Sequence, residues 1–325
     1  MLASGGRLLE TVSMKDKISE FARSLGFDLV GFSPAKIEDK YLEMFDQWLE
    51  GGKHGSMQYM EKIEQRRDLS LLLPGARSVI CLAVNYYKDR PELKPGHGKV
   101  ARYAYGRDYH KVIKKKLRAL TDYLEALAPD HRHKAYVDTG PILERALAEQ
   151  AGLGSIGKNA CLITPEHGSW VFLAEVITTL DLATTPAPKP FKIKAHVCGN
   201  CTLCIDACPT AAIIAPGVID SRLCISYLTI ENKDKIPPAL AKKISKAKRL
   251  YGCDICQEVC PQNTARQQIH THGELLEPKI AGDQLSKDDI PKTDPSFLAR
   301  FAGSAVMRAK RTGLERNINT VLGKF

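Results

Sequence analysis

The sequence predicts a mixed α/β domain, then a compact cysteine-rich domain and a helix-like tail. Two observations predict this order. Apolar, β-branched runs alternate with helical patterns through residue 179, whereas eight of the ten cysteines fall within residues 198–260. Between the two regions, the proline-rich stretch 181–196 breaks all periodicity and marks a domain crossing. We therefore expect domains at 14–185 and 186–270, followed by a helical tail at 271–325.

Length and composition place the chain among ordinary globular proteins. It has 325 residues, of which 44% are hydrophobic and 26% charged, so disordered and fibrous classes are excluded and two domains are expected. No run approaches the ~18 apolar residues that a membrane span needs, and the first residues lack a secretion signal, which predicts a cytoplasmic protein. The net charge of +10 favours a polyanionic partner.

The elements of the first domain follow from periodicity. The patterned sequence begins at Met14, which we take as the true start, with residues 1–13 as a dispensable leader. Pro141 is placed to begin a helix and Gly152 to end it, and the tail 304–325 is helix-like. The spacing predicts helices at 14–27, 41–50, 110–127 and 142–151, and strands at 27–33, 78–86, 134–138 and 170–179.

The clustered cysteines form two runs. The first has the spacing C-x2-C-x2-C-x3-C-P, in which three thiolates wrap one [4Fe–4S] cluster and the fourth, before proline, serves the other cluster. The second run, C-x2-C-x3-C-P, is one cysteine short, and Cys224 is the remaining thiol nearby. Symmetric exchange assigns one cluster to Cys198, Cys201, Cys204 and Cys260, and the other to Cys208, Cys224, Cys253 and Cys256.

Structural zinc is the alternative, because two four-cysteine sites would also use eight thiolates. Zinc ribbons, however, usually carry paired C-x2-C knuckles, so the spacing favours two iron–sulfur clusters. Cys81 and Cys161 lie in apolar, strand-like runs and are interpreted as small buried hydrophobic residues. Two clusters form an electron relay, so the preceding domain must supply the substrate site or another cofactor.

A glycine-rich segment, AGLGSIGKN (151–159), matches two phosphate-loop expressions, G-x-G-x-x-G and G-x4-G-K. Both require a strand before the loop and a helix after it, but here a helix precedes and an apolar run follows, and Asn159 lacks the hydroxyl that a P-loop places on magnesium. The segment is interpreted either as a backbone approach to a large or anionic ligand, helped by Lys158, or as a helix stop followed by a turn.

Asp138 opens the sequence DTGP between a predicted strand and a predicted helix. A carboxyl at the C-terminal end of a strand is where open α/β sheets gather their active sites. The alternative, which composition alone favours, is helix capping by Asp138 or Thr139 ahead of Pro141.

Longer motifs resemble the epoxyqueuosine reductase family over nearly the whole chain. Its members are cobalamin-dependent iron–sulfur enzymes that remove the epoxide oxygen of epoxyqueuosine at the wobble position of certain transfer RNAs. The resemblance implies an α+β fold with an N-terminal nitroreductase-like cobalamin-binding domain, a ferredoxin-type two-cluster domain and a helical C-terminal tail. The motifs are ARYAYGRDYHK (101–111), DTGPILERALAEQAGLGSIGKN (138–159), the cysteine run ending in CPT, LCISYLTIE (223–231), YGCDICQEVCPQN (251–263) and AKRTGLERN (309–317).

The resemblance also implies roles for residues. Asp138 becomes the general acid, kept protonated by burial near the corrin, and the eight cysteines become the cluster ligands. Loss of the epoxide oxygen as water consumes two electrons and two protons, and an unidentified low-potential donor supplies the electrons through the clusters. The implied cobalamin contacts are Gly157, Lys158, Asn159, Ser226 and Thr229.

Three basic blocks suit contacts with transfer RNA phosphates, although each alone is also typical of a solvated face. They are Lys111, Lys114, Lys115, Lys116 and Arg118; Lys242, Lys243, Lys246, Lys248 and Arg249; and Arg308, Lys310, Arg311 and Arg316.

Three other functions remain as alternatives. A corrinoid reductive dehalogenase would normally carry a twin-arginine export signal, which the internal pair Arg66-Arg67 does not make. A ferredoxin-type electron carrier would leave the first domain without a role. A zinc-containing nucleic-acid-binding module would be identified by metal analysis.

Overall fold

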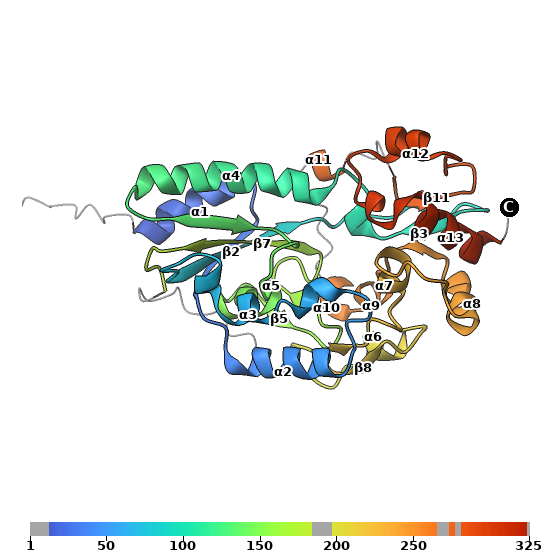
Figure 1. Cartoon of the computed structure of the whole chain (residues 1–325), viewed down its shortest axis with the longest axis horizontal. Coiled ribbons are helices and arrows are strands. Elements are labelled where there is room, and N and C mark those ends of the chain that lie inside the picture. Colours follow the sequence, from blue (N-terminus) through green and yellow to red (C-terminus); the bar gives the residue numbers. More distant parts are fainter. Residues whose placement is uncertain (1–12, 184–196, 265–272, 277–280, 324–325) are drawn as a thin grey trace, which may run out of the picture.

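A four-stranded antiparallel sheet forms the centre of the first region in the computed structural model (Figure 1), with strand order β1-β2-β7-β4. The structure describes residues 13–183, 197–264, 273–276 and 281–323, so the predicted leader 1–13 and the crossing 181–196 lie mostly outside the described residues. The strands are β1 (Leu29–Pro34), β2 (Ser78–Asn85), β4 (His133–Tyr136) and β7 (Val171–Thr178).

Helices cover both faces of this sheet. The helices α1 (Met14–Ser24) and α4 (Tyr109–Leu127) lie on one face and α5 (Glu144–Gln150) lies on the other (Figure 1). Strand β2 is buried throughout, with Ile80 and Leu82 in the core beneath α4 and Cys81 in the core beneath α5. This alternation is the two-residue period of a strand that is covered on both sides. Cys81 is therefore the small buried residue that the sequence predicted.

The predicted helices and strands of the first domain all occur, including α2 (Asp39–Glu50). Several boundaries differ by one to three residues, and α5 begins at Glu144 after the N-cap Leu143, which leaves Pro141 outside the helix. Gly152, with a φ of +79°, follows the end of α5 as expected. Short elements that periodicity did not predict are η1 (Gln58–Glu61), α3 (Ile63–Arg67), η2 (Leu69–Leu71), η3 (Arg102–Ala104), β5 (Ser155–Ile156) and β6 (Leu162–Ile163).

A second sheet joins all three regions of the chain. Strand β3 (Gly98–Val100) lies between β10 (Arg249–Tyr251), which is parallel to it, and β11 (Gln284–Leu285), which is antiparallel. Val100 is buried in a core shared with Phe301 and Ile318 of the tail. The segment around β3 thus packs against the cysteine region and the tail, although both lie far from it in the sequence.

The cysteine region and the tail consist mainly of short helices. The tail segment predicted to be helical forms a 3-10 turn followed by one longer helix. No helix in the described part of the chain has the length and apolar character needed to cross a membrane. The elements are α6 (Leu203–Asp206), β8 (Ile213–Ala215), β9 (Val218–Ile219), α7 (Ile225–Ile230), α8 (Pro238–Ala247), α9 (Ile255–Glu258), α10 (Pro261–Thr264), α11 (Gly273–Leu276), α12 (Asp294–Phe301), η4 (Ala305–Ala309) and α13 (Lys310–Leu322).

Candidate functional site

The two cysteine runs fold into the same local structure. Each run places the cysteine four residues before its Cys-Pro pair on a one-turn helix, Cys204 on α6 and Cys256 on α9, and these two helices pack together. Cys224 is the N-cap residue of α7. The sequence similarity of the runs is therefore matched by a repeat in the structure.

The first set of thiols gathers around Cys204. Burial raises the pKa of the Cys204 thiol, and its neighbours Cys198, Cys260 and Cys201 raise it further. Burial also raises the pKa of Cys260, which again has Cys198 and Cys201 as electrostatic neighbours. Cys260 of the second run is thus an electrostatic neighbour of the first three cysteines of the first run.

The second set gathers around Cys256. Burial raises the pKa of this thiol, and Cys161, Cys253 and Cys224 add to the effect. The pKa of Cys224 is raised by burial and by neighbouring Cys208. The neighbours again come from both runs.

Cys161 lies within electrostatic reach of both sets. Burial raises the pKa of its thiol to about 11, against the opposing charge of Arg145, and Cys260, Cys224 and Cys204 are among its neighbours. At neutral pH this thiol is therefore uncharged, as expected for the small hydrophobic role that the sequence predicted, although its residue is only partly buried.

Backbone amides donate to several of the cysteine sulfurs. Lys158 N–H donates to Cys198 Sγ at 3.4 Å, and Ala212 N–H donates to Cys208 Sγ at 3.2 Å. Such hydrogen bonds stabilise thiolate ligands and tune iron–sulfur clusters. Among the described residues, no three His, Cys, Asp or Glu side chains are arranged to hold a single metal ion.

The glycine-rich segment contacts the cysteine runs. It forms the β5–β6 hairpin, so the strand–loop–helix context of both phosphate-loop expressions is absent from this described segment. Lys158 Nζ donates to the carbonyls of Gly199 and Cys201, at 2.8 and 3.0 Å. Asn159, 2% exposed, donates from Nδ2 to the Cys256 carbonyl at 3.4 Å. Gly157 lies in the hairpin turn, where its N–H donates to the Cys161 carbonyl.

The other predicted cofactor residues lie on α7. Thr229 is fully buried, and its hydroxyl donates to the Ile225 carbonyl at 2.7 Å and accepts the Gly252 N–H at 2.9 Å. Ser226 is half-buried one turn earlier on the helix. The five predicted residues thus divide between two segments, and the polar side-chain atoms of Lys158, Asn159 and Thr229 bind other parts of the protein.

Asp138 stands at the end of β4 in a left-handed backbone conformation, with a φ of +56°. Its N–H donates to Glu144 Oε1 at 2.5 Å, and 55% of its side chain is exposed. The N-cap of α5 is Leu143 and no side chain caps this helix, so the capping interpretation of Asp138 and Thr139 is wrong. A non-glycine residue at positive φ in a loop is a feature that clusters at functional sites.

His110 links Asp138 to a second aspartate. The His110 Nε2 atom lies 3.0 Å from Asp138 Oδ2, and its Nδ1 atom lies 2.7 Å from Asp108 Oδ1. Asp108 caps α4 by accepting the His110 N–H. Tyr109 stacks on the His110 ring at a centroid distance of 4.1 Å. The start of α4 therefore fixes the imidazole between two carboxylates.

The charges of this site place a proton on the histidine. Burial opposes a charged imidazole, but the hydrogen bonds and charges of Asp108 and Asp138 raise the pKa of His110 to about 9. Burial acts to raise the pKa of Asp138, yet His110 and Tyr109 together lower it below its ordinary value. The imidazolium thus outweighs the desolvation in this arrangement and lowers the pKa of Asp138, and protonation of Asp138 by burial near the corrin stays a prediction.

A buried pair of carboxyls lies behind Asp138. Glu175 on β7 is 0% exposed and faces Cys81 and Tyr136 across the sheet. Burial first, and then the charge of Glu144, raises the pKa of Glu175, while burial and Asp138 raise the pKa of Glu144. This pair therefore retains a proton at neutral pH while it accepts the Asp138 N–H.

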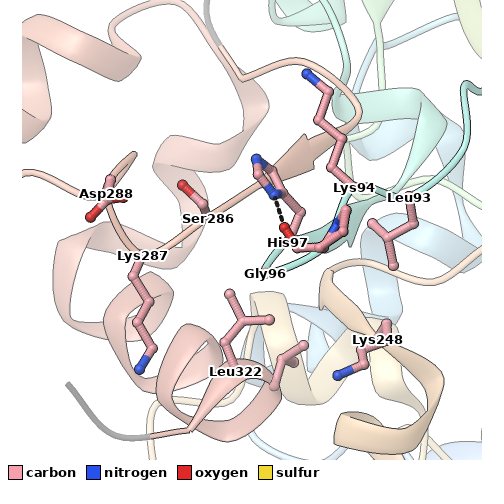
Figure 2. A pocket seen from close by; sticks show the side chains of 11 residues that line it. Leu93, Lys94, Gly96, His97, Lys248, Ser286, Lys287, Asp288 and Leu322 are labelled. Carbon is pink, nitrogen blue, oxygen red and sulfur yellow. Dashed lines mark hydrogen bonds between the residues drawn. The ribbon is translucent and has the colours of Figure 1, made fainter.

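A basic pocket of about 770 Å³ lies where the loop before β3, the end of α8 and the segment after β11 meet (Figure 2). Lys94, Lys248 and Lys287 line it from these three segments, together with His97 and one acid, Asp288. The neighbouring lysines Lys242, Lys243 and Lys246 of α8 are exposed.

Several members of the predicted basic blocks are used inside the protein. Lys116 donates to the carbonyls of Leu25 and Gly26, and Arg316 donates to three backbone carbonyls. The remaining pairs are Arg249 with Glu258, Arg308 with Glu231, and Arg311 with Asp294 and Glu315. These side chains are therefore poor candidates for phosphate contacts.

Sequence reasoning missed His110 and Glu144 as members of the Asp138 site. His110 lies in the quoted motif ARYAYGRDYHK and Glu144 in DTGPILERAL, so both segments were identified without these roles. The signal that was available for His110 is an aspartate two residues earlier, at the N-cap of a strongly predicted helix.

Two protein-family models match the chain. "Epoxyqueuosine reductase QueG, DUF1730" matches residues 66–139, and "4Fe-4S double cluster binding domain" matches residues 197–263. Similar curated proteins include the epoxyqueuosine reductase of Gloeobacter violaceus, 44% identical over 94% of this chain and 95% of that protein. The epoxyqueuosine reductase of Cellulophaga algicola is 42% identical over 94% of this chain and 96% of its own length.

Solved structures agree with these matches. An epoxyqueuosine reductase in complex with an epoxyqueuosine-modified tRNA-Tyr stem loop aligns with a TM-score of 0.85 at 36% identity, over 95% of this chain and 80% of that one. The Bacillus subtilis epoxyqueuosine reductase aligns with a TM-score of 0.83 at 34% identity, over 95% of this chain and 81% of that one. In that relative, a catalytic loop named for an aspartate is swung out of the active site.

Proposed function

The chain belongs to the epoxyqueuosine reductase family, a family of oxidoreductases, and we propose that it reduces epoxyqueuosine to queuosine at the wobble position of transfer RNA. One observation carries the proposal at the level of the site. The exposed carboxylate of Asp138 pairs with the protonated imidazole of His110. The glycine-rich hairpin of the same domain contacts the cysteine runs. Such a site can supply protons beside a source of electrons.

Two [4Fe–4S] clusters are the proposed electron path. One is held by Cys198, Cys201, Cys204 and Cys260, and the other by Cys208, Cys224, Cys253 and Cys256. The electrostatic neighbours of Cys204 and Cys256 support this division, and the amide donors to Cys198 and Cys208 support a ligand role for these two sulfurs. The match of residues 197–263 to a double-cluster domain is the independent support.

Cobalamin is the proposed second cofactor, and when bound it would supply a cobalt centre that accepts electrons singly and acts on the strained epoxide. Gly157, Lys158, Asn159, Ser226 and Thr229 are the residues proposed to hold it. The polar side-chain atoms of Lys158, Asn159 and Thr229 already form hydrogen bonds within the protein. These three residues therefore suit packing contacts with the cofactor better than hydrogen bonds to it.

Asp138 is the proposed general acid, and His110 is the proposed source of its proton. Removal of the epoxide oxygen breaks two C–O bonds, forms a C=C bond and releases water, with two electrons and two protons consumed. His110 Nε2 lies 3.0 Å from Asp138 Oδ2, so the proton on this nitrogen can pass to the carboxylate as the oxygen departs. The catalytic loop of the Bacillus subtilis relative, named for an aspartate, supports a reacting role for this loop.

Transfer RNA is the proposed substrate. The related structure in complex with a modified stem loop supports it, and the basic pocket of Lys94, Lys248 and Lys287 beside the lysines of α8 supplies positive charge for phosphates.

The deciding experiment is single-turnover conversion of RNA that contains epoxyqueuosine, with anaerobically purified, chemically reduced enzyme. We expect one queuosine per active site. Enzyme with full iron and cobalamin contents that leaves the epoxide intact would contradict the proposed function.

A further inference from the structure

A buried network of five charged side chains joins the first region of the chain to the second cysteine run. Arg90 and Arg102 come from the segment that follows β2, and Arg249 comes from β10. The two acids lie inside the cysteine run, Asp254 directly after Cys253 and Glu258 two residues before Cys260. We refer to these five residues as the arginine–carboxylate network.

Each acid of the network is held by more than one donor. Arg90 reaches Asp254 Oδ2 from Nη2 and Glu258 Oε1 from Nη1, both at 3.0 Å. Arg102 Nη1 lies 2.9 Å from Glu258 Oε1, and the Arg102 N–H donates to Asp254 Oδ2 at 2.9 Å. Arg249 donates to both oxygens of Glu258. The contacts are the charge-assisted pairs that Arg forms best.

The network is fixed and largely hidden from solvent. The side chains of Arg90, Arg249 and Asp254 are 9%, 4% and 2% exposed. Arg102 also lies over the Trp170 ring, with its guanidinium carbon 4.8 Å from the ring centroid. Glu258 is held by Arg90, Arg102 and Arg249 together, so its carboxylate is paired with three guanidinium groups. The charges are therefore permanent at any physiological pH.

The charges of the network do not cancel. Three guanidinium groups face two carboxylates, which leaves one net positive charge, and Lys99 is a further cation within electrostatic reach of Arg249 and Glu258. Buried charge is only weakly screened by salt, so its effect extends to neighbouring groups. Asp254 follows Cys253 directly in the chain, so this acid and its partners Arg90 and Arg102 lie next to one of the proposed ligands.

We infer that the arginine–carboxylate network is a built-in positive charge that raises the reduction potential of the iron–sulfur cluster held by Cys208, Cys224, Cys253 and Cys256. The inference rests on the proposed ligand assignment. A [4Fe–4S] cluster that accepts one electron gains one negative charge, so nearby positive charge stabilises its reduced form. The network makes this cluster easier to reduce than it would be in a neutral protein environment, and the five residues act as positioning and tuning residues without touching substrate.

The test uses opposite charge changes in one ion pair. Glu258→Gln removes a negative charge and should raise the midpoint potential of one cluster, whereas Arg249→Gln removes a positive charge and should lower it. Arg249→Lys keeps the charge and should stay closest to the parent value. The midpoint potentials of both clusters are measured by anaerobic titration of the full chain with dithionite, monitored by the electron paramagnetic resonance signals of the clusters. The potential of the other cluster should shift less.

Iron content separates this inference from the cofactor assignment. The inference is supported if both variants keep the wild-type iron content, and if the midpoint potential of this cluster rises in Glu258→Gln and falls in Arg249→Gln. Wild-type iron with shifts in the same direction, or with none, overturns it and leaves the network as a structural brace. If Arg249→Gln does not fold, Lys99→Gln replaces it, with a smaller lowering expected, and an unchanged or raised potential there also overturns the inference. Absence of iron from the parent chain would instead overturn the cofactor assignment itself.

Discussion

The cysteine region and the Asp138 site differ in how their parts reach one another. In the cysteine region, short spacings within two runs bring thiols onto matching one-turn helices, and only Cys224 comes from outside the runs. In the Asp138 site, the loop after β4 meets the first turn of α4, and Glu144 follows from the start of α5. A site built from local spacing can be predicted from sequence, whereas a site built by tertiary packing reveals only its most prominent residue.

The largest expected effect tests the exchange of ligands between the two cysteine runs. Cys260→Ser should remove the cluster that also needs Cys198, so iron should fall from roughly eight to roughly four per chain. The double variant Cys198→Ser/Cys260→Ser should lose no more iron than either single variant. Cys253→Ser/Cys260→Ser should lose nearly all of it, because its two thiols serve different clusters. Iron analysis of anaerobic protein is the measurement.

The control for this series is Cys81→Ala, which changes a buried cysteine of β2 and should keep all the iron. If Cys198→Ser/Cys260→Ser lost both clusters while Cys253→Ser/Cys260→Ser kept one, each run would hold its own cluster and the exchange would be wrong. That result would also weaken the claim that spacing alone is sufficient for this region.

The same contrast explains what could be predicted of the fold. Strand β2 and helix α4 were predicted because an unbroken apolar run and a 3.6-residue pattern are local signals. Strand β3 was not predicted, because its three residues become a strand only through pairing with β10 and β11. Arg249 was assigned to an RNA-binding block for a related reason, since its burial against Glu258 depends on a contact that the sequence does not display.

Asp138→Asn tests whether the second region is a reacting site. The variant cannot deliver a carboxyl proton, so we expect single-turnover conversion to fall roughly 10²- to 10⁴-fold with iron and cobalamin contents unchanged. Its thermal stability should fall only modestly, because Asn suits the left-handed backbone of this position but loses the partly exposed ion pair with His110. Asp122→Asn, an exposed position on α4, is the matched control and should convert RNA at the parent rate. Near-parent conversion by Asp138→Asn would remove this residue from the mechanism.

A smaller effect is expected for the lysines beside the basic pocket. Replacing Lys242, Lys243, Lys246 and Lys248 with Gln should weaken RNA binding and flatten its log–log salt dependence by up to about three to four units, roughly 0.7 to 0.9 for each phosphate that is no longer neutralised. The cluster spectra should not change. Fluorescence-anisotropy titrations between low and moderate salt measure the slope.

The matched control for the lysines carries the same change of charge elsewhere. Lys17, Lys36, Lys40 and Lys62 are exposed and lie outside the basic blocks, so their replacement with Gln should leave the slope nearer to the parent value. Equal slopes for both quadruple variants would make the α8 lysines an ordinary solvated face.

The most sensitive test of the comparison concerns His110, one of the two residues of this site that sequence reasoning missed. Asp108 and Asp138 raise its pKa to about 9, so the imidazole is protonated below that pH and loses its proton above it. If this proton supplies Asp138, the single-turnover rate should be level below pH 9 and fall about tenfold per pH unit above it. His110→Gln should lower the rate and abolish this inflection, whereas the control His131→Gln, whose ring lies near Thr179, should retain it. Because the pKa of Glu144 is also raised, an inflection that survives in His110→Gln but disappears in Glu144→Gln would assign the proton to the buried carboxyl pair instead.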